Sequence, residues 1–223
     1  MCGRFTRTTP PERFAKLFDA TGVVELHPSY NIAPSQNILA ARNTPDGGRE
    51  LVALHWGLVP HWSKGPDPKY SMINARADSL ATKPAYRDPF KRRRCLIAAD
   101  GFYEWRKLGD SKQPYYIRLR GGQPFAFAGL WDYWQAEGAA PIESCTIITC
   151  DANALVAGIH ERMPVILPPR LYDAWMDPKA AGGAALSALL KPYPDTLMDA
   201  YPVGRGVNSP KNDSPELIEA ASL

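Results

Sequence analysis

The feature that most constrains the fold is a series of short apolar runs, rich in β-branched and aromatic residues, that turn-forming segments separate. The strands that these runs predict lie at 37–42, 50–59, 95–105, 114–120, 124–134, 144–150 and 163–167. The predicted helices lie between Thr9 and Gly22 and at 151–159, 169–176 and 183–190. This order shows no steady alternation of strand and helix. We therefore predict an α+β fold, a single domain over residues 1–223 with a strongly curved, mainly antiparallel, barrel-like sheet and peripheral helices.

Two short segments make the prediction more specific. Residues 120–123 read RGGQ and join the run 114–120 to the run 124–134, which is the pattern of a β-hairpin. The run 144–150 contains Cys145 and Cys150, whose odd spacing places them on opposite faces of one strand. We therefore expect these two thiols not to bond to each other.

The composition argues against several classes of protein. The 223 residues contain no apolar run near the about 20 that cross a bilayer, and the first residues lack the apolar core of a signal peptide. The four cysteines form no C-x-x-C pair, so no metal or organic cofactor is predicted. We expect a cytoplasmic protein with reduced thiols. The net charge of +3 permits an anionic partner without requiring one, and the basic run 91–94 is expected to be a solvated strand entry.

Cys2 follows the initiator methionine directly, in the string MCGRF. If Met1 is removed, Cys2 carries its α-amine and its thiol on adjacent carbons, as a 1,2-aminothiol. One interpretation is a disordered terminus with a cysteine that has no role. The other is an ordered segment that Phe5 anchors, in which the Arg4 cation favours the thiolate.

Four further polar residues leave similar alternatives open. Asn74 lies two residues before an arginine and shares a face with it on a strand, but an asparagine is also a common local cap. Glu104 is either an exposed strand residue or a buried acid with a raised pKa. His160 is either structural or catalytic, and Arg162 meets either an anion or a surface carboxylate. Together with Cys2 they supply the groups that attack a carbonyl and move protons around it.

Six separated strings resemble one known family in its own order. They are MCGRF, YNIAPSQ, WGLVPHW, INARADS, ADGFYEW and IHERMP, followed by a weaker match through GVNSPKNDSPEL. The family is that of the SOS response-associated peptidases, whose members are abasic-site processing proteins. The resemblance covers the whole chain.

The resemblance implies a covalent reaction with abasic sites in single-stranded DNA. The α-amine of Cys2, freed of Met1, condenses with the sugar aldehyde, and the thiol then closes a thiazolidine ring. Asn74 would hold the reacting groups, Glu104 would shuttle protons, and His160 would help to open the sugar ring. Whether Met1 leaves by self-processing or through an aminopeptidase stays open.

The resemblance also implies how the DNA is held. Three arginines would meet phosphates, and two further residues would stack on bases or wedge against them beside the lesion. The arginines are Arg4, Arg76 and Arg162, and the stacking or wedging residues are Pro34 and Trp62. The implied partner is single-stranded DNA with abasic sites, bound by a monomer that is associated with the nucleoid if the source is bacterial.

Two other functions stay open at this stage. The first is an amidohydrolase or peptidase that uses the Cys2 thiol as an N-terminal nucleophile, with its own amine as the base. The second is a non-covalent module for single-stranded DNA, for which Trp62 and the arginines suffice. Loss of a DNA adduct on replacing Cys2 distinguishes covalent capture from both.

Overall fold

The computed structural model describes residues 2–67, 72–180 and 183–221, so Met1, whose removal is predicted above, lies outside the described residues. The strands are β1 (Phe5–Arg7), β2 (Ser29–Ile32), β3 (Asn37–Asn43), β4 (Arg49–Trp56), β5 (Asn74–Arg76), β6 (Arg94–Ala99), β7 (Gly101–Leu108), β8 (Ser111–Leu119), β9 (Phe125–Trp134), β10 (Ile142–Asp151), β11 (Arg162–Pro164), β12 (Ile166–Leu167) and β13 (Met198–Pro202). The α-helices are α1 (Pro11–Phe18), α2 (Pro84–Arg92), α3 (Ala154–Ala157), α4 (Tyr172–Met176) and α5 (Ala184–Ser187).

One set of strands closes on itself. Strand β10 pairs with β4, β4 with β3, β3 with β6, β6 with β9, and β9 pairs again with β10. The pairings of β10 with β4 and with β5 are parallel, and the others in this sheet are antiparallel. The predicted α+β fold with a curved, mainly antiparallel, barrel-like sheet is therefore confirmed.

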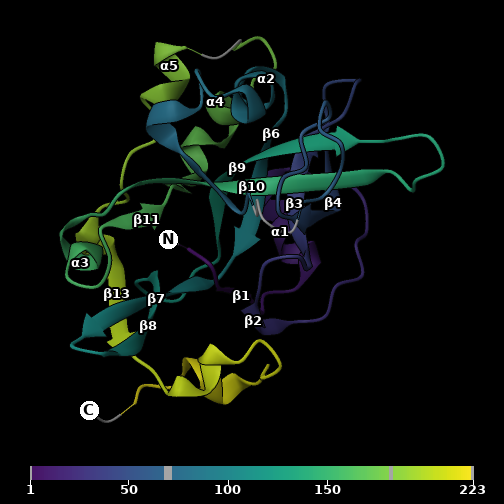
Figure 1. Cartoon of the computed structure of the whole chain (residues 1–223). Coiled ribbons are helices and arrows are strands. Elements are labelled where there is room, and N and C mark those ends of the chain that lie inside the picture. Colours follow the sequence, from purple (N-terminus) through teal and green to yellow (C-terminus); the bar gives the residue numbers. More distant parts are fainter. Residues whose placement is uncertain (1, 68–71, 181–182, 222–223) are drawn as a thin grey trace.

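A second sheet has the strand order β13–β8–β7–β1–β2 and contains the N-terminal strand. Figure 1 shows β7, β8 and β13 together with the C-terminal segment at one end of the molecule, and α2, α4 and α5 at the other. Helix α1 packs against β3 and β4, and α2 against β6 and β9. The helices are peripheral, as predicted, and the barrel and the second sheet meet at β1.

The predicted hairpin between 114–120 and 124–134 is wrong. Strand β8 pairs with β7 and β13, whereas β9 pairs with β6, β10 and β12. The chain leaves the barrel at Asp100, between β6 and β7, and returns to it through the RGGQ turn. Gly121 and Gly122 have φ values of 81° and 67°, so this turn reverses the chain without selecting the strand partner.

The basic run 91–94 is only in part the solvated strand entry that its charge predicts: Lys91 and Arg92 are exposed, whereas Arg94 is buried. Lys91 and Arg92 form the last turn of α2, a helix that the apolar pattern did not predict. Arg94 is 4% exposed and donates to the carbonyl oxygens of Phe90, Lys91, Trp175 and Asp177. A guanidinium has five donor hydrogens, and four carbonyls at helix ends accept four hydrogen bonds from this one. Among the described residues, none of the helices combines the length and the apolarity that a membrane span requires.

Candidate functional site

The N-terminal strand is held firmly by both sheets. Phe5 pairs with Ile32 of β2 and Phe102 of β7, and its ring meets the rings of Trp56 and Phe127 edge-on at 5.2 and 5.7 Å between centroids. Asp100 accepts the backbone N–H groups of the two threonines that follow β1. The segment that carries Cys2 is thus ordered, and the interpretation as a disordered terminus is wrong for it.

Cys2 is fully buried, and its Sγ donates to the Arg4 carbonyl oxygen at 3.9 Å. Burial raises the pKa of the Cys2 thiol well above its usual range, and the negative charge of Glu104 raises it further. The expectation that Arg4 favours the thiolate is wrong. The Arg4 guanidinium donates to Asn31 Oδ1 at 2.9 Å and to the Val207 carbonyl at 2.8 Å.

Asn74 begins β5, which lies parallel to β10. Its Nδ2 donates to the Cys2 carbonyl oxygen at 2.8 Å, although 72 positions separate the two residues. Its Oδ1 is buried and has no hydrogen-bond partner within the described part of the chain. Asn74 is therefore not a local turn cap: it fixes the main chain of Cys2 and keeps one buried acceptor available.

Glu104 lies on β7 and is 2% exposed, so the alternative of an exposed strand residue is wrong. Burial raises the pKa of its carboxyl, and the positive charge of His160 opposes this shift. The charge of Glu104 acts on Cys2, and the charge of His160 acts on Glu104, so Glu104 lies within electrostatic reach of both residues. A carboxyl of this kind holds its proton at a pH at which an exposed glutamate is ionised.

His160 follows α3 and is half-buried. The backbone N–H of Arg162 donates to His160 Nδ1 at 3.0 Å. His160 Nδ1 also lies 3.2 Å from the Arg162 carbonyl oxygen, and in the neutral tautomer that accepts from the Arg162 N–H the proton lies on Nε2. The ring can therefore offer a donor at Nε2, while Arg162 holds its orientation through the main chain.

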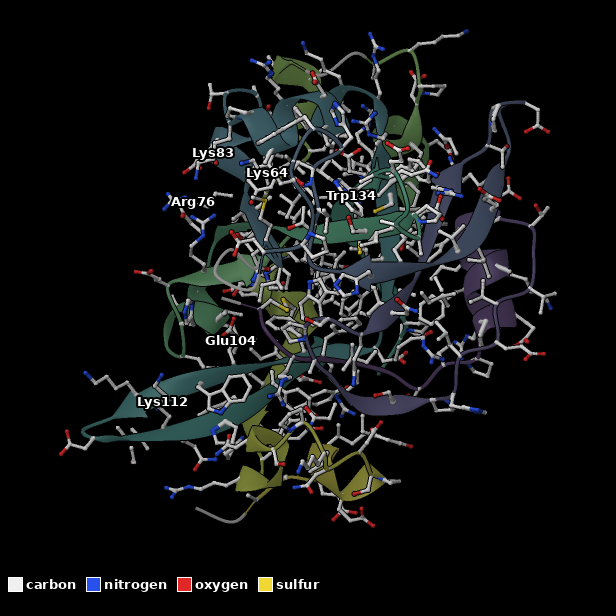
Figure 2. The ribbon with its side chains drawn as sticks, turned by 45° about the vertical axis from the view of Figure 1, so that its right-hand side comes forward. Lys64, Arg76, Lys83, Glu104, Lys112 and Trp134 are labelled. Carbon is white, nitrogen blue, oxygen red and sulfur yellow. The ribbon has the colours of Figure 1, made fainter. Side chains whose placement is uncertain are left out.

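Glu104 and His160 both line an open cavity of about 480 Å³. Trp105, Lys112 and Asn208 complete the lining, and Trp105 Nε1 donates to Asn208 Oδ1 at 2.8 Å. In the view of Figure 2, Lys64, Arg76 and Lys83 lie on one side of Glu104 and Lys112 lies on the other. Of these four residues, Lys112 lines the same cavity as Glu104.

The sequence reasoning did not single out the three further lining residues as functional. Trp105 and Asn208 lie within the strings ADGFYEW and GVNSPKNDSPEL, so the motifs contained a signal for them. Lys112 lies in none of the motifs, and only the pairing of β7 with β8 brings it to the cavity.

The predicted DNA contacts differ in their accessibility. Arg76 is exposed, and its guanidinium makes two bonds to Asp78, at 2.7 and 3.2 Å. Arg162 is 6% exposed and bonds the Asp151 carboxylate at 3.1 Å and the Thr149 carbonyl at 2.8 Å.

The two predicted stacking residues lie outside the cavity lining. Pro34 is half-buried, whereas Trp62 is 56% exposed. Among the described residues, neither is part of the lining of the cavity that holds Glu104. The structure therefore brings Cys2, Asn74, Glu104 and His160 together, and the DNA-contact roles stay predictions.

The fold and the site define a barrel protein in which a buried cysteine precedes the first strand and lies near an acid, and the acid shares a cavity with an imidazole. A family model described as SOS response associated peptidase (SRAP) matches residues 1–210, and the chain belongs to this family. The abasic site processing protein YoqW of Bacillus subtilis is 46% identical over 224 residues, covering 99% of this chain and 100% of that protein. The abasic site processing protein HMCES of Gallus gallus is 34% identical, over 88% of this chain and 67% of its own length. A crystal structure of a Bacteroides thetaiotaomicron protein matches with a TM-score of 0.89 at 28% identity, covering 99% of this chain and all of that one.

Proposed function

We propose that this protein processes abasic sites in DNA by forming a covalent thiazolidine through Cys2 after Met1 has been removed. The relatives at 46% and 34% identity are named abasic site processing proteins. The observation that carries the proposal is the buried Cys2, whose carbonyl is fixed by Asn74 and whose thiol lies near a buried acid.

The proposed reaction has two bond-forming steps. The α-amine of Cys2 adds to the C1′ aldehyde of the open-chain sugar, and loss of one water gives an imine. The thiol then adds across the C=N bond: sulfur bonds to carbon, and the thiol proton passes to nitrogen. The five-membered ring contains both nucleophiles of one residue, so an internal cysteine cannot form it.

Glu104 is proposed as the proton shuttle of these steps. Its raised pKa lets it donate a proton to the hydroxyl that leaves as water, and its carboxylate can then accept the thiol proton. The raised pKa of Cys2 makes this second transfer necessary, because the buried thiol does not ionise by itself near neutral pH. The acid and the nucleophile thus depend on each other.

Asn74 and His160 are proposed to position the reactants. Asn74 Nδ2 holds the Cys2 carbonyl, and its buried Oδ1 can accept from the attacking amine or from a sugar hydroxyl. When protonated, His160 can donate its Nε2 proton to the ring oxygen of the closed sugar; the C1′–O4′ bond then breaks, the C1′ hydroxyl releases its proton to solvent, and the aldehyde forms. The cavity of about 480 Å³ has room for the sugar and an adjoining phosphate.

The DNA is proposed to be single-stranded and to be bound by a monomer that acts near the nucleoid. Arg4, Arg76 and Arg162 would contact phosphates, with Pro34 and Trp62 against the bases. Phosphate would have to displace Asp78 from the Arg76 guanidinium, since the two are paired in the free protein. Sequence would not be read, because stacking and phosphate contacts tolerate any base.

Intact-mass spectrometry after incubation with a single-stranded oligonucleotide that carries one abasic site tests the proposal. The expected mass is that of the protein without Met1, plus the DNA, minus one water. Cys2→Ala should give no adduct that survives denaturation, but borohydride should trap its imine because the amine is retained. A stable adduct in Cys2→Ala without borohydride would refute thiazolidine formation. Turnover of an amide substrate without DNA would favour the amidohydrolase alternative instead.

A further inference from the structure

Trp62 is the most exposed of the large aromatic side chains in the described part of the chain. Both of its neighbours in sequence, however, are held by hydrogen bonds to residues of β9. On one side, the His61 backbone N–H and its Nδ1 each lie 3.0 Å from Asp132 Oδ2. On the other side, the Ser63 carbonyl accepts from Trp134 Nε1 at 3.0 Å. An exposed indole between two anchored residues is unusual for a surface loop.

The groups that hold loop 59–65 lie on one face of the β9–β10 ribbon. In the antiparallel register, Asp132 stands opposite Ser144, and Trp134 follows two residues later on the same face. Ser144 Oγ accepts the backbone N–H of Val59 at 2.8 Å, at the start of the loop. We call Asp132, Trp134 and Ser144 the loop latch.

The loop latch is itself buried and constrained. The Asp132 carboxyl is 2% exposed, and Arg93 Nε lies 3.1 Å from its Oδ1. Trp134 is 6% exposed, and a Cβ at Gly65 would lie 3.1 Å from its ring. This short distance shows that the indole and the end of the loop are closely packed. Gly65 also has a φ of +125°, a conformation that favours glycine.

We infer that Asp132 and Trp134 are positioning residues for single-stranded DNA, which hold loop 59–65 so that Trp62 forms a rigid stacking surface for a base. This inference rests on the proposed function. A free loop would lose conformational entropy when a base stacks on its tryptophan, whereas the loop latch has removed that entropy before binding. Neither residue needs to touch the DNA to affect affinity.

Two variants weaken the loop latch with little risk to folding. His61→Ala removes a ring that is 44% exposed and leaves Asp132 paired with Arg93. Trp134→Phe removes the donor to the Ser63 carbonyl and the indole atoms nearest Gly65, and it keeps an aromatic ring on the same face of β9. His27→Ala is the matched control, because His27 is exposed and contributes its carbonyl, not its ring, to the hydrogen bond from Arg7.

The first measurement is the Kd for an oligothymidylate without a lesion, by fluorescence anisotropy. Trp62→Ala should weaken binding by about fivefold to 150-fold. His61→Ala and Trp134→Phe should each weaken it by about twofold to tenfold, and neither should weaken it further in the Trp62→Ala background. The salt slope should not change, because no phosphate contact is lost.

The second measurement is amide hydrogen exchange over residues 59–65 in the free protein. Both latch variants should exchange faster there than the wild type, and His27→Ala should not. The inference would be overturned if both latch variants bound the oligothymidylate with wild-type affinity. It would also be overturned if they lost as much affinity in the Trp62→Ala background as in the wild type, or if the wild type did not bind the oligothymidylate. Failure of the proposed function alone has a different signature, in which lesion-free DNA binds through Trp62 but no adduct forms on abasic DNA.

Discussion

The hydrogen bond from Asn74 to Cys2 gives the sharpest test of how the site works. Asn74 Nδ2 is the donor that holds the carbonyl of the fully buried Cys2, at 2.8 Å. Asn74→Ala leaves this carbonyl without that donor, and a buried acceptor without a partner costs about 1–3 kcal/mol. This loss destabilises the reactive placement of Cys2 relative to its unreactive placements. The adduct rate at saturating DNA should then fall about fivefold to 150-fold.

Asn74→Asp separates the loss of the donor from a loss of volume. It keeps the size of the side chain and one oxygen at the Oδ1 position, but it places a second oxygen against the Cys2 carbonyl. Its rate should fall at least as far as that of Asn74→Ala. Asn37→Ala, at an exposed asparagine at the start of β3, is the control and should react at the wild-type rate.

Single-turnover adduct formation, followed on denaturing gels over a range of DNA concentrations, gives the rate at saturation and the half-saturating concentration separately. We expect the rate to fall and the half-saturating concentration to change little, because the bond lies within the protein. An unchanged rate in Asn74→Asp, or a change only in half-saturation, would refute the positioning role.

Three further outcomes follow from the buried acid, a close glycine contact and the phosphate sites. Because burial raises the folded pKa of Glu104, wild-type stability falls as pH rises from the ordinary glutamate range through that raised pKa. In Glu104→Gln the adduct rate should fall by about 10²–10⁴-fold. The urea midpoint of this variant should exceed that of the wild type at neutral pH and lose this advantage in acid. A difference in midpoint that does not change with pH would contradict the raised pKa of Glu104. A Cβ at Gly101 would lie 2.3 Å from Tyr116 Oη, so Gly101→Ala should cost about 1–3 kcal/mol in urea unfolding, whereas Gly204→Ala, with no atom within 4 Å of its Cβ, should be nearly neutral. Arg76→Ala should lower the salt slope of DNA binding by about one unit, and an unchanged slope would exclude a phosphate contact.

The local sequence pattern predicted where the strands lie better than it predicted which strands pair. The alternation of apolar and turn-forming residues predicted strands where β3, β4, β8, β9 and β10 lie, and the curved barrel-like sheet is confirmed. It predicted one strand over 95–105, where β6 and β7 belong to different sheets, and one over 163–167, where β11 and β12 lie. The same pattern failed for β8 and β9, which were predicted to pair with each other. A two-glycine turn permits a reversal, but strand partners depend on contacts with residues distant in sequence.

For the candidate site, too, the identity of the residues was predictable from the sequence, whereas their surroundings were not. The residues of the site could be named because their types are few and their strings resemble one family: Cys2, Asn74, Glu104 and His160 were all predicted. The environment of each was not predictable, since the sequence left Glu104 as either exposed or buried and assigned Arg4 to the thiol. Only the folded structure, in which β1 joins the second sheet and Phe5 packs against the barrel, buries Cys2 and raises its pKa. Only the register of β5 on β10 brings Asn74 to the Cys2 carbonyl.

By itself, the sequence determined which groups are available: an aminothiol once Met1 is removed, an acid within an aromatic strand, one imidazole and a set of arginines. The tertiary structure decided their states and their partners. It buried Glu104 and Cys2 together, bound Arg162 to Asp151, and anchored the neighbours of Trp62 on Asp132 and Trp134. The physical reason is that pKa values and hydrogen bonds depend on solvent exclusion and on distances of a few ångströms, which the folded chain sets between residues far apart in sequence.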